Sequence, residues 1–213
     1  MNLIIIGPQG SGKGTQAGLL AQKFNLVHID TGLALREAAE EKTAFGRKLY
    51  KIVNEHHDLV SDEIVKKVLE NEVRKVPESK GIILDGAPRR KDQIEEVVGI
   101  LGKAGRKISH VVFINIPEKE SIRRIASRYE CSKCFSRYTV GKDVKTGKEK
   151  CPSCGGNLRK RKDDTGAGIR KRLSIFFEQT MPVVEYFRRN KSLIEVDGRK
   201  SIEEVFQSIV KKL

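Results

Sequence analysis

The apolar run Leu3–Ile6 leads directly into the stretch Gly7-Pro8-Gln9-Gly10-Ser11-Gly12-Lys13-Gly14-Thr15-Gln16. Its spaced glycines permit backbone conformations that a side chain would forbid, so N–H groups can turn inward around a phosphate. The pattern G-x-x-x-x-G-K-[ST] is met as far as Lys13, but Gly14 stands at its last place. The alternative is a chance glycine-rich turn, which the position behind a strand disfavours. The stretch therefore predicts a phosphate-binding loop in which Lys13 reaches the β- and γ-phosphates of a nucleotide.

Short apolar runs recur along the chain and alternate with stretches of helical spacing. Most of the runs carry neighbouring β-branched residues, which is typical of strands that are buried on both faces of a parallel sheet. This alternation predicts an α/β fold, with a parallel five-stranded sheet and helices on both faces. The expected strands are Leu3–Ile6, Leu26–Ile29, Gly81–Leu84, Val111–Ile114 and Leu193–Val196. The expected helices are Lys13–Phe24, Ser61–Lys75, Lys91–Lys103 and Ile169–Asn190.

Positive charge is concentrated in one part of the chain. The 213 residues carry a formal net charge of +14, and the segment from Lys119 to Arg172 holds 17 Lys and Arg against 6 Asp and Glu. The same segment contains all four cysteines, so we expect an inserted subdomain there. A positive field of this kind favours anionic partners such as nucleotides, nucleic acid or an anionic membrane surface. The scattered lysines Lys142, Lys145 and Lys148 are instead expected on a solvated face.

The sequence argues against membrane and secreted classes. No apolar run approaches the roughly 20 residues of a transmembrane helix. The first residues also lack the basic segment and long apolar run of a signal peptide. We therefore expect a cytoplasmic protein without a membrane partner. Structural disulfides are rare in that compartment, and metal-bound cysteines are commoner.

The four cysteines form two pairs with regular spacing. Cys131-Ser132-Lys133-Cys134 is followed after sixteen residues by Cys151-Pro152-Ser153-Cys154. This C-x₂-C-x₁₆-C-x₂-C pattern falls in the range of four-cysteine zinc sites, where four thiolates close a tetrahedral structural site. The alternatives are two disulfides or four free thiols. The spacing and the expected compartment favour a structural Zn²⁺ held by Cys131, Cys134, Cys151 and Cys154.

The glycine-rich stretch resembles the amino-terminal motif of the nucleoside monophosphate kinases, and of adenylate kinases in particular. Further segments match this family in its order and at close to its spacing, almost from end to end of the chain. Each match is weak alone, and together they are specific. The segments are Thr31-Gly32 with Leu35-Arg36, Leu59-Val60-Ser61-Asp62, Leu84-Asp85-Gly86-Ala87-Pro88-Arg89 with Gln93, Arg161-Lys162-Asp163-Asp164, Arg170-Lys171-Arg172-Leu173 and Val196-Asp197-Gly198.

The resemblance implies a P-loop NTPase-type sheet with two insertions. A core nucleotide-binding domain would comprise residues 1–30, 61–127 and 165–213. A helical monophosphate-binding subdomain would comprise residues 31–60, and a zinc-bearing lid would comprise residues 128–164. Many adenylate kinases carry a zinc-bearing lid at this place, which agrees with the cysteine spacing.

The resemblance also implies an activity and a set of site residues. The activity is reversible Mg²⁺-dependent phosphoryl transfer from ATP to AMP, giving two ADP. The implied catalytic residues are Lys13, Arg89, Arg124, Arg161 and Arg172. The implied ATP-binding residues are Gly10, Ser11, Gly12, Lys13, Gly14, Thr15, Arg124, Arg128 and Lys200. The implied AMP-binding residues are Thr31, Arg36, Leu59, Val60, Gly86, Arg89, Gln93, Arg161 and Arg172. Asp85 would hold waters on Mg²⁺.

Three departures from the family pattern concern the monophosphate pocket. Leu33 and Ala34 replace a more usual Asp-Met, and Ala87 replaces a usual Phe, so the choice of monophosphate is less defined than the reaction. A UMP/CMP-type kinase is the nearest alternative, although Thr31 favours AMP. Arg123 is an alternative to Arg124 at the matching position, and the spacing to Arg128 favours Arg124.

A basic zinc-ribbon protein that binds RNA or DNA is the alternative from another class. Nucleic acid is the less favoured partner, because only Tyr129, Phe135 and Tyr138 in the basic segment could stack on bases. The sequence predicts no particular oligomeric state.

Overall fold

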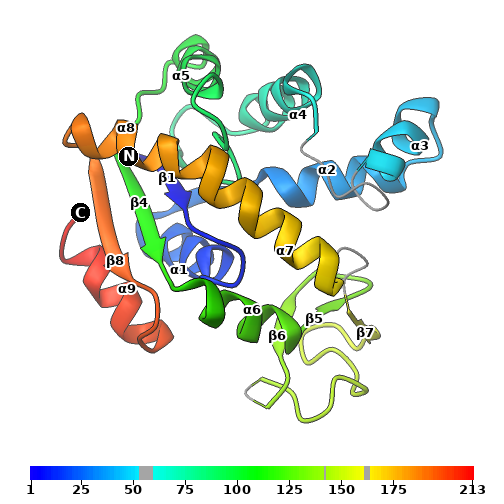
Figure 1. The fold of residues 1–213 in the computed structure, drawn as a ribbon. Helices are drawn as coiled ribbons and strands as arrows, with labels where there is room; N and C mark the ends of the chain where they lie inside the picture. Colours follow the sequence, from blue (N-terminus) through cyan, green and yellow to red (C-terminus); the bar gives the residue numbers. More distant parts are fainter. Residues whose placement is uncertain (53–59, 142, 161–163) are drawn as a thin grey trace.

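Five parallel strands form the main sheet of the computed structural model, in the order β2-β3-β1-β4-β8. Figure 1 shows β1, β4 and β8 of this sheet side by side. The structure describes residues 1–52, 60–141, 143–160 and 164–213. The strands are β1 (Asn2–Ile6), β2 (Leu26–Asp30), β3 (Gly81–Asp85), β4 (His110–Asn115) and β8 (Leu193–Asp197). All four pairings within this sheet are parallel, with Ile4 opposite both Leu84 and Val111. The predicted five-stranded parallel sheet is confirmed.

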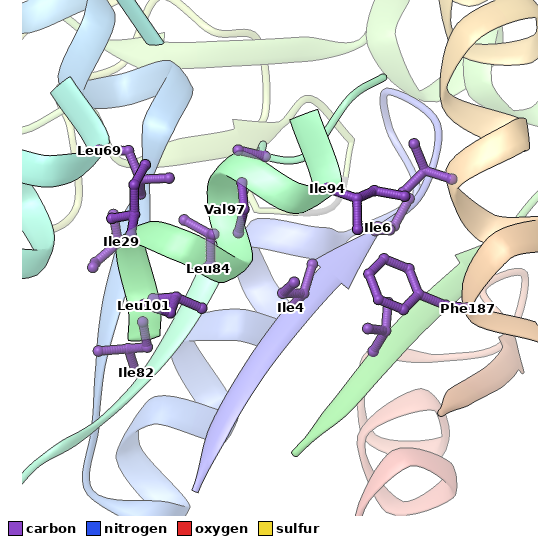
Figure 2. Close-up of a cluster of buried hydrophobic side chains, with 14 of the residues drawn as sticks. Ile4, Ile6, Ile29, Leu69, Ile82, Leu84, Ile94, Val97, Leu101 and Phe187 are labelled. Carbon is purple, nitrogen blue, oxygen red and sulfur yellow. The ribbon is translucent and has the colours of Figure 1, made fainter. Parts of the chain in front are cut away.

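The central strand β1 divides its side chains between two hydrophobic cores. Leu3 and Ile5 join one cluster of buried residues, and Ile4 and Ile6 join the other. Figure 2 shows Ile4 and Ile6 among the buried side chains of the second cluster, near Phe187. Successive strand residues point to opposite faces, so an uninterrupted apolar run is what a strand covered on both faces requires.

Helices cover both faces of the sheet. On the face of Leu3 and Ile5 lie α1 (Lys13–Phe24) and α9 (Ile202–Val210), which contribute buried residues to that cluster. On the face of Ile4 and Ile6 lie α4 (Asp62–Arg74), α5 (Gln93–Lys103) and α8 (Met181–Arg189). The predicted helices 13–24, 61–75 and 91–103 correspond to α1, α4 and α5, with ends that differ by at most two residues.

The predicted helical stretch Ile169–Asn190 is helical as far as Arg189, but a π-helical turn interrupts it. The structure has α7 (Gly166–Ile175), a π-helical turn (Phe176–Thr180) and α8. The helix starts earlier because the Thr165 side chain accepts a hydrogen bond from the Gly168 N–H and caps it. The π-helical turn directs Thr180 Oγ1 onto the carbonyl oxygen of Arg89, 2.9 Å away. An extra residue in one helical turn re-aims side chains, as is common beside functional sites.

Two short helices and a small second sheet lie outside the main sheet. Helices α2 (Thr31–Glu40) and α3 (Ala44–Tyr50) share a separate cluster of buried residues with Val60. After α6 (Glu118–Ala126), the antiparallel strands β5 (Arg128–Cys131), β6 (Arg137–Thr139) and β7 (Leu158–Arg159) form a sheet in the order β6-β5-β7. Figure 1 shows this small sheet near the amino-terminal end of α7. The division into core, monophosphate-binding subdomain and lid stays a prediction.

None of the described helices has the length and apolar composition that a membrane crossing requires.

Candidate active site

A cavity of about 840 Å³ extends over the carboxyl ends of the main-sheet strands. Open parallel sheets bind ligands in this place. The cavity is lined by the loop between β1 and α1, the start of α2, the turn after β3, the small sheet and the turn after β8. Segments far apart in the sequence therefore face one common space.

The loop between β1 and α1 presents backbone N–H groups to this cavity. Gly10 and Gly12 have φ values of +80° and +93°, which a residue with a side chain rarely adopts, and α1 begins immediately after Gly12. The first N–H groups of a helix have no carbonyl partner within the helix, and they lie at the positive end of its dipole. Ser11 Oγ is buried with no hydrogen-bond partner among the described residues. The start of α1 and the Ser11 hydroxyl therefore offer donors of the kind that bind an anion. The ATP-binding role of residues 10–15 stays a prediction.

Lys13 lies at the start of α1 with its ammonium group against the same loop. Its Nζ donates hydrogen bonds to the carbonyl oxygens of Gly7 at 2.7 Å and Pro8 at 3.0 Å. Burial lowers the pKa of Lys13 to about 8; Asp85 opposes this shift, and nearby arginines add to it. A cation in this state gains from a bound anion, because a phosphate favours its charged form.

Asp85 ends β3 beside the loop and is 5% exposed. One of its carboxylate oxygens lies 3.8 Å from His28 Nε2. Asp30 stands opposite Asp85 in the β2–β3 pairing, and atoms of His28, Asp30 and Asp85 come within 4.8 Å of one another. Asp85 thus lies at the carboxyl end of β3, and its predicted role is to hold waters on Mg²⁺.

The predicted monophosphate residues gather on the other side of the cavity. Arg89 Nε donates to the Gly86 carbonyl oxygen at 2.9 Å, and the Arg89 backbone N–H donates to Gln93 Oε1 at 2.8 Å. The Arg36 and Arg89 guanidinium groups both lie close to Gly32 at the start of α2. Thr31 is 2% exposed, and its Oγ1 has no hydrogen-bond partner among the described residues. Val60 also lines the cavity, and Leu59 lies outside the described residues.

Two of the arginines predicted at the site, Arg128 and Arg172, meet on one buried carboxylate. Arg128 holds Asp164 through Nε at 3.0 Å and Nη2 at 2.7 Å, and Arg172 Nη2 reaches Asp164 Oδ1 at 2.5 Å. The Asp164 side chain is 2% exposed, and both arginines line the cavity. Arg161 lies outside the described residues. Lys200 is exposed at the rim of the cavity.

Arg124 and Arg123 differ in their surroundings. Arg124 pairs with Glu120 at 2.6 Å and points Nη1 toward the carbonyl oxygen of Gly10 at 3.4 Å. The Arg123 side chain also pairs with Glu120, but it is 72% exposed against 24% for Arg124. Contact with the phosphate loop therefore favours Arg124 over Arg123 for the predicted role.

The four cysteines converge, as predicted from their spacing. Their sulfur atoms form one group, with Cys131 and Cys154 3.5 Å apart and Cys134 and Cys151 3.6 Å apart. Tetrahedral zinc with Zn–S bonds of about 2.3 Å puts its sulfurs about 3.8 Å apart, so the group fits such an ion. None of the four forms a disulfide, and a bonded pair would be about 2.05 Å apart. The cluster is a possible metal site.

The hydroxyl of Tyr138 supports this cluster from the neighbouring strand. It lies 3.1 Å from Cys151 Sγ. Burial raises the pKa of the Cys151 thiol, but the Tyr138 hydroxyl and the N–H groups of Cys154 and Ser153 lower it more, to about 6. A stabilised thiolate is the form that binds a metal ion.

Comparison with known proteins agrees with this geometry. The family model described as adenylate kinase matches residues 5–192. The chain belongs to the adenylate kinase family. A curated adenylate kinase from Kosmotoga olearia is 38% identical over 213 residues, which is 100% of this chain and 99% of that protein. Adenylate kinases from Dehalococcoides mccartyi (39% identical, covering 98% and 96%) and Methanocella arvoryzae (37%, covering 96% and 94%) are also similar.

Sequence reasoning missed two side chains at the site of this adenylate kinase family member. Arg137 of β6 reaches across the cavity, and its Nη2 lies 2.6 Å from Asp30 Oδ2. Asp164 was noted only within a basic motif and not as the shared partner of Arg128 and Arg172. Arg137 follows the first cysteine pair in a basic segment, but nothing in the local sequence indicates which of its cations faces the phosphate loop. An ion pair between residues 107 apart leaves no periodic signal.

Proposed function

We propose that this chain catalyses Mg²⁺-dependent transfer of the γ-phosphoryl group of ATP to AMP, giving two ADP, and the reverse reaction. The observation that carries the proposal is one cavity that joins the phosphate loop to the Arg36–Arg89 pocket, with further cations between them. With one nucleotide bound on each side, the donor and acceptor phosphates would meet inside the cavity. The phosphoryl group would then be transferred directly, without release into water. Such positioning supplies most of the catalysis that phosphoryl transfer needs.

The phosphate loop would bind ATP. Backbone N–H groups of Gly10, Ser11, Gly12, Gly14 and Thr15 would hold its phosphates at the start of α1, where the helix dipole favours anions. Lys13 would leave the carbonyl oxygens of Gly7 and Pro8 for the β- and γ-phosphates. Arg124 and Arg128 would add charge from the lid side, and Lys200 would lie near the adenine.

The opposite pocket would bind AMP. Arg36 and Arg89 would hold its phosphate, since paired guanidinium groups match the geometry of phosphate oxygens. The buried Thr31 hydroxyl, which has no hydrogen-bond partner among the described residues, would face the base side of the pocket. The remaining contacts would come from Leu59, Val60, Gly86 and Gln93.

The transfer itself needs charge neutralisation more than acid–base chemistry. The acceptor is a phosphate that is already an anion near neutral pH, so no strong general base is required. Lys13, Arg89, Arg124, Arg161 and Arg172 would surround the moving phosphoryl group. Cations that are fixed before the reaction stabilise charge that develops in the transition state, and that is why they accelerate the step.

Asp85 fits the role of a magnesium-positioning residue. Its carboxylate is buried and lies next to the phosphate loop, since a Cβ built on Gly14 would stand 3.7 Å from Asp85 Oδ2. Mg²⁺ prefers oxygen ligands and keeps several of its waters. Asp85 would hold such waters, and the ion would neutralise phosphate charge when bound.

Zinc is the metal that we propose for Cys131, Cys134, Cys151 and Cys154. A four-thiolate site leaves no open position for catalysis, so its role would be to stabilise the lid. We also propose the division into a core (residues 1–30, 61–127 and 165–213), a monophosphate-binding subdomain (31–60) and a lid (128–164), and a cytoplasmic location in which the thiols stay reduced.

A coupled assay of ADP formation tests the proposed function. The protein is given MgATP with AMP, CMP, UMP or GMP in separate reactions. We expect rapid ADP formation with AMP and at least tenfold lower kcat/KM with the other three. Higher kcat/KM with CMP or UMP would instead identify the alternative kinase class. Absence of transfer with all four, combined with tight binding of RNA or DNA, would replace the proposal with the nucleic-acid-binding alternative.

A further inference from the structure

Arg137 connects the small sheet to the main sheet. It is the first residue of β6, yet its guanidinium leaves that sheet and donates from Nη2 to Asp30 Oδ2 at the end of β2, 2.6 Å away. The Asp30 side chain is 13% exposed and that of Arg137 is 33% exposed. The pair therefore lies in the mouth of the cavity rather than on the open surface.

The same guanidinium group packs against the phosphate loop. A Cβ built on Gly14 would stand only 2.5 Å from Arg137 Nη1, so the approach depends on the missing side chain at that residue. The charge of Arg137 also contributes to the lowered pKa of Lys13. Arg137 thus covers the place where the loop N–H groups and Lys13 face the cavity.

Asp30 is held in position as the acceptor for this contact. Its other oxygen, Oδ1, accepts the Leu33 N–H at 2.8 Å and caps α2. Burial alone would raise the pKa of Asp30, but the charges of Arg137 and Arg36 and the Leu33 N–H lower it to about 2. The carboxylate is therefore ionised at neutral pH and cannot turn away without losing its cap.

Arg137 makes this contact although its own sheet offers it another carboxylate. Glu130 stands directly opposite Arg137 in the β5–β6 pairing, is 3% exposed, and has an Oε2 without a hydrogen-bond partner among the described residues. Directly opposed residues share one face of a sheet. Arg137 nonetheless extends to Asp30 of the main sheet. The ion pair therefore links the two sheets instead of neutralising charge within the small one.

We propose that Asp30 is a positioning residue that holds the lid over the phosphate loop through Arg137 before nucleotide binds. The expected effect on ATP kinetics rests on the proposed function. Closure of the lid in the nucleotide-free protein can be measured whether or not the protein is a kinase. Because the Asp30–Arg137 pair already holds the lid over the phosphate loop, ATP binding has to order less of the protein. This preorganisation increases the affinity for ATP. Breaking the pair therefore raises the KM for ATP more than it lowers kcat.

The test compares Asp30→Asn, Arg137→Gln and the double variant with Arg159→Gln. Asparagine remains a good helix cap, so Asp30→Asn removes the charge and keeps α2. Arg159 is exposed on β7 of the same sheet, which makes it a matched control for loss of one lid cation. Hydrogen exchange of the amides of residues 10–15 is followed in the nucleotide-free protein, and KM and kcat for ATP are measured in parallel.

We expect each of the two single variants to speed exchange at residues 10–15 and to raise the KM for ATP by roughly two- to fivefold, as for a pair that is not fully buried. The double variant should resemble either single variant, because both remove the same contact. Arg137→Lys should recover part of the protection, and Arg159→Gln should match the wild type.

The proposal is overturned if exchange at residues 10–15 in Asp30→Asn and Arg137→Gln equals that of Arg159→Gln, or if the effects of the two substitutions multiply in the double variant. Melting temperatures near the wild-type value show that a change in exchange is not loss of fold. If the wild type fails to make ADP from ATP and AMP, the proposed function fails, and the exchange experiment still decides whether the lid is held closed.

Discussion

Arg128 and Asp164 form a two-bond ion pair that joins the two ends of the proposed lid, with Nε–Oδ2 and Nη2–Oδ1 distances of 3.0 and 2.7 Å. The residues are 36 apart in the sequence, and this span contains all three strands of the small sheet, of which Arg128 is the first residue. Arg172 of α7 shares the same carboxylate. The base of the proposed lid thus has one buried carboxylate between two cations that also line the cavity.

Replacing Asp164 with Asn should destabilise the nucleotide-free protein. Arg128 and Arg172 would then lose the carboxylate that they share, and loss of a buried charged hydrogen-bond partner costs about 1–3 kcal/mol in the free energy of unfolding. A bound nucleotide brings its own negative charge to the same arginines, so ATP should restore most of the lost stability. Chemical denaturation with and without ATP measures both effects.

The matched control for Asp164 is Glu178→Gln, which neutralises an exposed carboxylate nearby in the chain. An equal loss of stability in the two variants, or a loss that ATP does not reduce, would contradict the role assigned to Asp164.

Replacing Lys13 with Ala should lower turnover by at least about 10²-fold and reduce ATP affinity by much less. Lys13 is the one flexible cation proposed for the transferring group, and its contribution grows as charge develops in transit. Steady-state kinetics together with equilibrium binding separate the two effects. Lys23→Ala, at the exposed end of the same helix, should leave both unchanged. A folded Lys13→Ala protein with near-normal turnover would show that the loop is not the reaction site.

The lowered pKa of Lys13 predicts a pH dependence of ATP binding. The group titrates at about 8 in the folded protein against its usual 10.5, so the free protein loses this cation above pH 8. Bound phosphates favour the charged form, and ATP affinity should therefore fall as the pH rises from 8 to 10. ATP binding is measured across this pH range for the wild type and for Lys13→Arg. The affinity of Lys13→Arg should fall less, because a guanidinium stays charged up to pH 10.

The sign for stability is opposite to that for binding. Between pH 8 and 10.5 the unfolded chain binds a proton at Lys13 that the folded chain has lost. The contribution of this residue to the free energy of unfolding therefore rises with pH over that window. Identical pH profiles for the wild type and Lys13→Arg, in both binding and stability, would contradict the assignment of this pKa.

The cysteine cluster should hold one metal ion per chain. Because a metal that binds only the folded form adds to its stability, chelation should lower the melting temperature by about 5–10 °C. Elemental analysis and calorimetry provide the measurements. Cys151→Ser should lose the metal, and Ser132→Ala, which keeps all four thiols, should retain it. A metal-free protein with four titratable thiols and an unchanged melting temperature would contradict a structural metal site.

The sequence predicts the sheet well because its signals are local. Each strand of the main sheet is a short apolar run, and burial on both faces makes such runs recognisable without knowledge of their neighbours. The strand order β2-β3-β1-β4-β8 was not predicted, since it depends on how the connections between the strands pack. The helical stretch 169–190 was predicted without its π-helical turn, because such a turn preserves helical spacing on either side and adds one residue within it.

In the candidate site too, the residues in local sequence motifs were predicted, and those whose partners lie far away in the sequence were not. The phosphate loop and the cysteine pairs are contiguous motifs, and the structure brings their members together as their spacing predicts. Arg137 and Asp164 could not be assigned because their roles come from partners 107 and 36 residues away. In a segment with many cations, composition alone does not indicate which one crosses the cavity.

The central claim is that one cavity holds both nucleotides for direct transfer. A ligand that joins two adenosines through five phosphates spans both sites, so it binds without the entropy cost of a second molecule. Calorimetric titration with this ligand and Mg²⁺ tests the claim most directly. We predict one ligand per chain, an affinity at least 10²-fold above that for ATP alone, and competition with both ATP and AMP. Two ligands per chain, or binding that AMP does not compete with, would contradict it.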